Sequence, residues 1–100
     1  MEKEFKHLDK IILSNLKKFN LTDEALEYAE IEYNRGLDYY HSRIKNLSIS
    51  GLKALDAGCG VGNWSIALSN FFKEVISIDL NKDRLKCARS VSKKINVNLK

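Results

Sequence analysis

The sequence predicts an α/β protein, the N-terminal half of a doubly wound parallel-sheet domain preceded by two helices. Three observations predict this class. The first half of the chain has apolar residues at helical spacing, and the second half alternates short apolar runs with helical segments. A cluster of glycines joins the first of these runs to the helix after it. Strands that alternate with helices favour a parallel sheet with right-handed crossovers.

The first fifty residues are predicted to be helical. Apolar residues recur every three or four positions over residues 4–19, which indicates one amphipathic helix. A polar break follows, and Thr22 before two acidic residues is typical of a helix N-terminus. The apolar stripe then continues to Leu47 and predicts a second long helix, weakened only by Gly36 at about 1 kcal/mol relative to alanine.

The second half has the rhythm of strands and helices. Residues 53–57 are a short strand candidate, and apolar residues from Trp64 onward predict a helix of about ten residues. Residues 74–79 carry β-branched side chains on both faces, as expected of a parallel strand that is covered on each side. Asn81 is a good N-cap for the next helix, and residues 96–100 predict the opening of a third strand.

The composition bounds the kind of protein. One hundred residues without proline, 44% hydrophobic and 30% charged, form one small domain or part of a larger one. Two or three parallel strands have too few neighbours to be covered, so we expect the chain to stop inside its domain. The longest apolar run has three residues and the N-terminus lacks a signal peptide, so we expect a cytoplasmic protein without a membrane span.

Charge and cysteines exclude some classes of function. The net charge of +4 suits an anionic partner, but basic residues are scattered, and we interpret Lys17-Lys18 and Lys93-Lys94 as solvated helix faces. The charge therefore does not predict nucleic-acid binding, although it leaves that partner open. Cys59 and Cys87 form no CxxC motif and have no histidine at ligand spacing, so neither a zinc site nor a disulfide framework is expected.

The informative motif lies between the first predicted strand and the next helix. Residues 56–63 read Asp-Ala-Gly-Cys-Gly-Val-Gly-Asn, and Asp79 ends the following strand. Glycines let the backbone turn and let a ligand approach the main chain, where the first N–H groups of the helix are unpaired. An acidic residue about twenty positions further on can accept hydrogen bonds from both ribose hydroxyls of an adenosine. Because Asn63 stands where a dinucleotide fingerprint needs glycine, an NAD or FAD site is the less favoured alternative.

These residues resemble the class I S-adenosylmethionine-dependent methyltransferases. The resemblance rests on residues 55–65 and 75–80 and extends over about residues 52–95. It implies a Rossmann-like fold with S-adenosylmethionine as cofactor, whose methionine part lies above the glycine loop. It also implies that Asp79 binds the ribose, that Leu80 packs on the adenine and that Asp56 helps to orient the cofactor's amino group. The cofactor-binding residues expected from it are Asp56, Gly58, Cys59, Gly60, Gly62, Asn63, Asp79, Leu80 and Arg43.

The resemblance also implies a division of the chain. Residues 1–50 would be a helical segment that covers the cofactor site, and residues 51–100 the first βαβα part of the cofactor-binding domain. In that arrangement Arg43 would pair with the cofactor carboxylate and Tyr39 or Tyr40 would line the site, whereas an exposed arginine needs no function. We interpret Trp64 and Cys59 as packing residues. Methyl transfer from a sulfonium requires no nucleophilic side chain, which fits the absence of a catalytic triad pattern.

The sequence leaves the acceptor and the catalytic base unknown. A small molecule is slightly favoured as acceptor, and nucleic acid stays open. Because the acceptor-binding segments would follow Lys100, we expect no methyl transfer by residues 1–100 alone. The alternative hypothesis is a non-catalytic remnant or interaction module that pairs with another chain through an exposed sheet edge.

Overall fold

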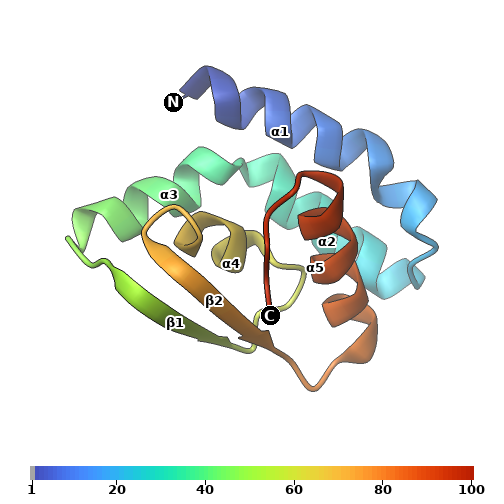
Figure 1. The fold of residues 1–100 in the computed structure, drawn as a ribbon. Helices are drawn as coiled ribbons and strands as arrows, with labels where there is room; N and C mark the ends of the chain where they lie inside the picture. The colour runs from blue at the N-terminus through green and yellow to red at the C-terminus, as the bar shows by residue number, and fades with distance from the viewer. Residues whose placement is uncertain (1) are drawn as a thin grey trace.

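The fold is an α/β arrangement around a two-stranded parallel sheet, as predicted. The computed structural model describes residues 2–100, with side chains described from Phe5 onward (Figure 1). The elements are α1 (Glu2–Asn15), the 3-10 helix η1 (Leu16–Phe19), α2 (Asp23–Arg35), α3 (Leu37–Asn46), β1 (Gly51–Ala57), α4 (Asn63–Leu68), β2 (Phe72–Ile78) and α5 (Lys82–Lys94). None of the helices in this described part combines the length and apolar character needed to cross a membrane.

The two strands form a βαβ unit. They pair in parallel from Gly51 opposite Phe72 to Ala57 opposite Ile78, and α4 lies between them in the chain. On the other edge of β2, Leu99 forms a parallel bridge with Val75. This bridge lies where the sequence predicts the opening of a third strand.

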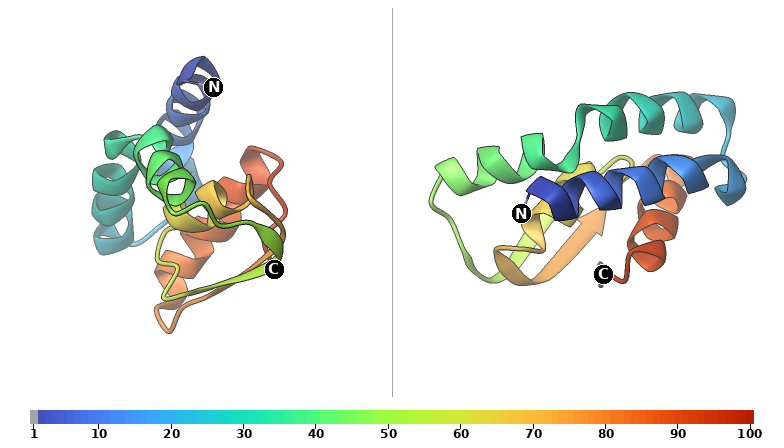
Figure 2. Two further views of the ribbon diagram at one scale, coloured as in Figure 1. Left: turned by 90° about the vertical axis from the view of Figure 1, so that its left-hand side faces the viewer. Right: turned by 90° about the horizontal axis from the view of Figure 1, so that it is seen from above.

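The helices gather on one face of the strands (Figure 2). Val75 and Ser77 point to this face and are buried. Leu55 and Ile78 point to the opposite face and are 61% and 49% exposed. Within the described residues, β2 is therefore covered on one side only, although its β-branched side chains predict cover on both sides.

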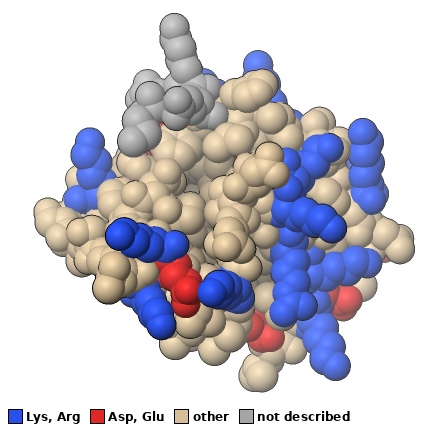
Figure 3. All heavy atoms as spheres, in the orientation of Figure 1, with Lys and Arg blue, Asp and Glu red and all other residues tan. Residues whose placement is uncertain are grey.

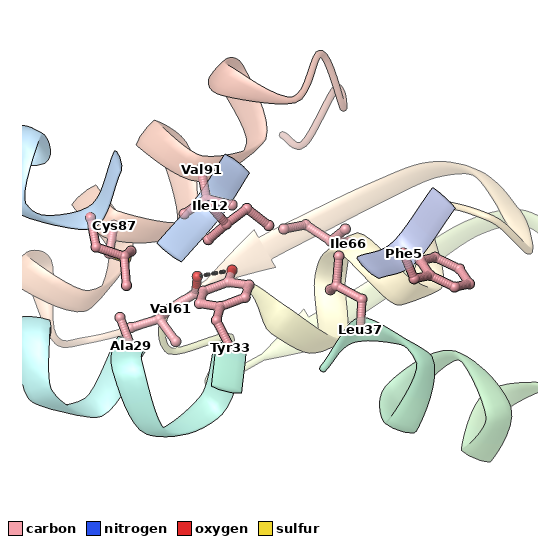
Figure 4. Close-up of a cluster of buried hydrophobic side chains, with 10 residues drawn as sticks. Phe5, Ile12, Ala29, Tyr33, Leu37, Val61, Ile66, Cys87 and Val91 are labelled. Atoms are coloured by element: carbon pink, nitrogen blue, oxygen red, sulfur yellow. Dashed lines mark hydrogen bonds between the residues drawn. The ribbon is translucent and has the colours of Figure 1, made fainter. Parts of the chain in front are cut away.

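One apolar core joins the helical first half to the second half. Ile12 of α1, Tyr33 of α2 and Val91 of α5 meet there around Val61 of the glycine loop (Figure 4). Full burial of one valine or isoleucine side chain contributes about 1.5–3 kcal/mol to the free energy of folding. The buried members of this cluster are Phe5, Ile12, Leu16, Ala29, Tyr33, Leu37, Val61, Ile66, Cys87 and Val91.

The first predicted helix changes character at Asn15. The α-helix ends there and the chain continues as the 3-10 turn η1. The Asn15 side chain donates to the Ile11 carbonyl (2.7 Å), so it competes for a backbone acceptor of the last α-helical turn. Asn20 then takes a left-handed conformation with φ of 54°, which asparagine tolerates well. The prediction of a single helix over residues 4–19 was wrong in its last turn.

The second predicted helix is two helices. Gly36 has φ of 95° and separates α2 from α3, a conformation that glycine adopts without the strain of a Cβ atom. The Leu37 N–H at the start of α3 donates to the Asp9 carboxylate of α1 (3.0 Å). This contact from a distant helix caps α3 and stabilises the break, so the prediction of one helix to Leu47 was wrong.

Both predicted N-caps are confirmed. Thr22 accepts a hydrogen bond from the Ala25 N–H (3.2 Å), and Asn81 accepts from the N–H groups of Asp83 and Arg84. The helix predicted after the glycines corresponds to α4, which ends at Leu68 and is shorter than the expected ten residues.

Candidate functional site

The glycine loop, residues 58–62, follows β1 at the carboxyl edge of the sheet. The N–H groups of Gly58 and Cys59 both donate to the Ile78 carbonyl (2.8 and 2.9 Å), which ties the start of the loop to the end of β2. Gly58, Gly60 and Gly62 have φ of 73°, 55° and 93°. Glycine adopts such angles far more readily than other residues do, so the spacing of the three glycines is a backbone requirement.

Asp79 lies beside this loop, directly after β2. One of its carboxylate oxygens accepts from the Gly60 N–H (2.7 Å) and the other from the Asn81 N–H (2.7 Å). These two bonds fix the carboxylate. Since each carboxylate oxygen has two acceptor positions, Asp79 can still accept hydrogen bonds from a ligand's hydroxyl groups.

A depression of about 330 Å³ lies at this edge, lined by Gly58, Ile78, Asp79 and Leu80. The Leu80 side chain is fully exposed, and a Cβ atom on Gly58 would meet no atom within 4 Å. The depression thus combines bare backbone, two apolar side chains and one carboxylate. This donor set fits the base and ribose of an adenosine, which need apolar packing and a hydroxyl acceptor.

Asp56, the last residue but one of β1, lies on the helix-covered face of the sheet. It accepts a hydrogen bond from Ser65 Oγ (2.6 Å), and Ser65 Oγ lies 2.7 Å from Ser77 Oγ. Because the single hydroxyl proton of Ser65 goes to Asp56, Ser77 is the donor to Ser65. Burial raises the pKa of Asp56, and the Ser65 bond opposes that rise. No role was predicted for these serines, although Ser77 is the register partner of Asp56 and could have been found by aligning the two strands.

Helix α2 packs against the glycine loop. Tyr33 Oη donates to the Val61 carbonyl (2.6 Å), and Asn63 Nδ2 donates to the Glu32 carboxylate (3.3 Å). The Tyr28 ring lies against Gly60, where a Cβ atom would be 3.4 Å from it. No role was predicted for Glu32 or Tyr28. In the sequence these two residues are distinguished only by lying on a predicted helix, and the element against which that helix packs could not be predicted.

Comparison with known proteins gives one family match for this half of the chain. Residues 52–100 match the model of a family described as RNA cap guanine-N2 methyltransferase. This match confirms the resemblance to the class I methyltransferases. The matched segment includes the glycine loop, Asp79 and the whole depression.

A solved structure also resembles the chain. It is described as an S-adenosylmethionine-dependent methyltransferase from Clostridium acetobutylicum ATCC 824 and is 18% identical, with a TM-score of 0.46. The match covers 96% of this chain, which spans only 28% of that protein. None of the curated proteins matches the chain.

Most of the expected site residues lie around the glycine loop, but Arg43 stands apart from them. Arg43 lies in the last turn of α3, near the start of β1, whereas the glycine loop follows the opposite end of that strand. Its guanidinium stacks over the exposed Tyr39 ring, 4.8 Å from the centroid. The Tyr40 ring is buried and contacts Trp64 edge to face (4.7 Å).

Cys59 and His41 are packed in the interior. Cys59 is buried, and burial raises the pKa of its thiol to about 11, which keeps it protonated at neutral pH. His41 lies between the rings of Phe5 and Phe71, and burial lowers its pKa. Among the described residues, no three histidine, cysteine or acidic side chains are grouped as metal ligands.

The hydrogen bond from Tyr33 to the glycine loop is expected to stabilise the fold. A Tyr33→Phe variant keeps the buried ring but leaves the Val61 carbonyl without its partner. We expect the free energy of unfolding to fall by about 1–3 kcal/mol. Tyr39→Phe removes the same atom from an exposed ring and is the matched control, with an expected change below about 0.5 kcal/mol. Urea denaturation measures both, and equal midpoints for the two variants would contradict the role of Tyr33.

Proposed function

We propose that this chain forms the S-adenosylmethionine-binding part of a methyltransferase. The observation that carries the proposal is the Asp79 carboxylate, which is held by the Gly60 N–H at the rim of a depression next to the bare backbone of Gly58. The family match over residues 52–100 supports it. The residues present fit the cofactor's adenosine, since they offer an acceptor for the ribose hydroxyls and an apolar wall for the base.

The side chains have distinct tasks in this proposal. Asp79 accepts the ribose hydroxyls, and Leu80 with Ile78 packs against the adenine and excludes water. The loop from Gly58 to Gly62, with Cys59 and Gly60 inside it and Asn63 after it, lies beneath the methionine part. Asp56, fixed by Ser65, orients the cofactor's ammonium group. The bound cofactor would supply a methyl group activated on its sulfonium, so the chain's own residues need only to bind and align.

For the acceptor we propose RNA. The description of the matched family names RNA as the molecule that is methylated. This description outweighs the slight preference for a small molecule that the sequence alone gave. We assign no residue of this chain to the selection of the acceptor atom or to the removal of its proton.

Isothermal titration calorimetry tests the cofactor assignment directly. The purified protein is titrated with S-adenosylmethionine, with its demethylated product S-adenosylhomocysteine and with NAD. We expect both sulfur compounds to bind and NAD to give no heat of binding. Binding of NAD without either sulfur compound would instead support the dinucleotide site that Asn63 disfavours.

A second candidate function is pairing through the sheet. In the described part of the chain β1 pairs with β2 alone, so its outer edge is unpaired, and Leu55 on the open face is 61% exposed. Unpaired strand edges of this kind pair with other chains. Light scattering after size-exclusion chromatography measures the mass, and a monomer would exclude pairing between copies.

A further inference from the structure

The exposed face of α5 carries a basic residue on every turn. Lys82, Lys86, Arg89 and Lys93 follow one another at intervals of four, three and four residues, and all four side chains are exposed. Residues at this spacing lie on one face of a helix. The face extends away from the cofactor depression, because α5 begins shortly after Leu80.

Helix η1 packs against α5 and carries two more exposed lysines, Lys17 and Lys18. Lys86 Nζ donates to the Asn20 carbonyl at the end of η1 (3.1 Å). A depression of about 390 Å³ between the two helices is lined by Phe19, Ser90, Lys93 and Lys94. Figure 3 shows Lys and Arg side chains gathered over this part of the surface. We call the group the basic band, formed by Lys17, Lys18, Lys82, Lys86, Arg89, Lys93 and Lys94.

The fold thus concentrates charge that is scattered in the sequence. Lys17-Lys18 and Lys93-Lys94 lie at opposite ends of the chain, and separately each indicates only a solvated helix face. The ion pairs among the described side chains are Arg35–Glu32, Arg84–Glu24 and Lys100–Glu74, and none includes a residue of the basic band. Like charges within a Debye length of about 8 Å repel one another, and a polyanion would relieve that repulsion.

We propose that the basic band binds the phosphodiester backbone of single-stranded RNA, several nucleotides away from the methylated base. This proposal rests on the proposed function in one respect, the choice of RNA as acceptor. From Lys82 to Lys93 the basic face extends about 17 Å along the helix, so it fits a chain of repeated negative charges better than one phosphate group. A lipid surface fits less well, because no large hydrophobic side chain of η1 or α5 is among the exposed ones.

Binding of RNA is measured by fluorescence anisotropy with a short labelled oligouridine over a range of KCl concentrations. The test variant replaces Lys17, Lys18, Lys93 and Lys94 with alanine. We expect its affinity at moderate salt to fall by at least about tenfold. If all four lysines contact phosphates, the slope of log K against log salt becomes shallower by about 3. The corresponding four-arginine variant keeps the charge and should restore binding.

The matched control removes the same charge elsewhere. Lys6, Lys45, Lys53 and Lys73 are exposed and lie outside the basic band, and their alanine variant should bind RNA within about twofold of the wild type. Circular dichroism melts confirm that each variant is folded. If the band variant and the control variant lose RNA affinity equally, the loss reflects net charge alone and the proposal is overturned. So would wild-type protein that binds no oligouridine, or that prefers phosphatidylserine vesicles to it.

Calorimetry with S-adenosylmethionine on the same proteins separates the two proposals. A band variant that loses RNA but keeps cofactor binding supports both. Wild-type protein that binds RNA through the band but binds no cofactor supports the band and overturns the cofactor assignment.

Discussion

An Asp79→Ala variant is expected to bind S-adenosylmethionine at least about 30-fold more weakly than the wild-type protein. The substitution removes the charged acceptor proposed for two ribose hydroxyls, and a hydrogen bond to a charged group contributes about 1.5–3 kcal/mol. It also leaves the Gly60 N–H without its partner, so the loop loses a contact that holds it against β2. Isothermal titration calorimetry measures the dissociation constant.

Two further variants show whether position or charge is responsible. Asp83→Ala removes the same charge from an exposed residue in the first turn of α5, outside the depression, and should change the affinity by less than about twofold. Asp79→Asn keeps an acceptor oxygen for the Gly60 N–H but loses the charge, so an intermediate affinity is expected. Wild-type affinity in Asp79→Ala would contradict the proposed ribose contact.

The features of the fold that could be predicted are those whose physical cause is local. Thr22 and Asn81 cap helices through side-chain bonds to their own next turns, so the sequence around each is sufficient. The break at Gly36 could not be predicted, because the Asp9 carboxylate that caps α3 comes from another helix. The apolar stripe continues through the break, since both helices bury the same kind of face.

The candidate site divides in the same way. The spacing of the glycines and the place of Asp79 follow from one βαβ unit and are visible in the sequence. The bond from Tyr33 to Val61 depends instead on how α2 packs beneath the loop, which no local pattern encodes. Arg43 was predicted from its helix alone, and the structure places it in the last turn of α3, near the start of β1 and not near the glycine loop that follows that strand.

Alanine at Gly62 is expected to destabilise the protein strongly, whereas alanine at Gly58 is expected to weaken cofactor binding. A Cβ atom on Gly62 would lie 2.9 Å from Ala88 Cβ and 3.0 Å from Ala88 Cα, at a backbone φ of 93°. Overpacking costs about 1–3 kcal/mol and the left-handed conformation about 1–2 kcal/mol, so we expect a loss of about 3 kcal/mol. A domain of this size should then melt at least about 10 °C lower.

Gly58→Ala is the matched control for this loss, since it makes the same chemical change at a positive φ in the same loop. Its Cβ would meet no atom within 4 Å, so only the conformational cost of about 1–2 kcal/mol applies. The methyl group would instead narrow the depression lined by Gly58 and Asp79, and the affinity for S-adenosylmethionine should fall.

An Ala88→Gly substitution should partly rescue Gly62→Ala, because it removes the nearer of the two clashing atoms and leaves the backbone contact. Equal melting temperatures for the two loop variants would contradict the close packing of α5 against Gly62.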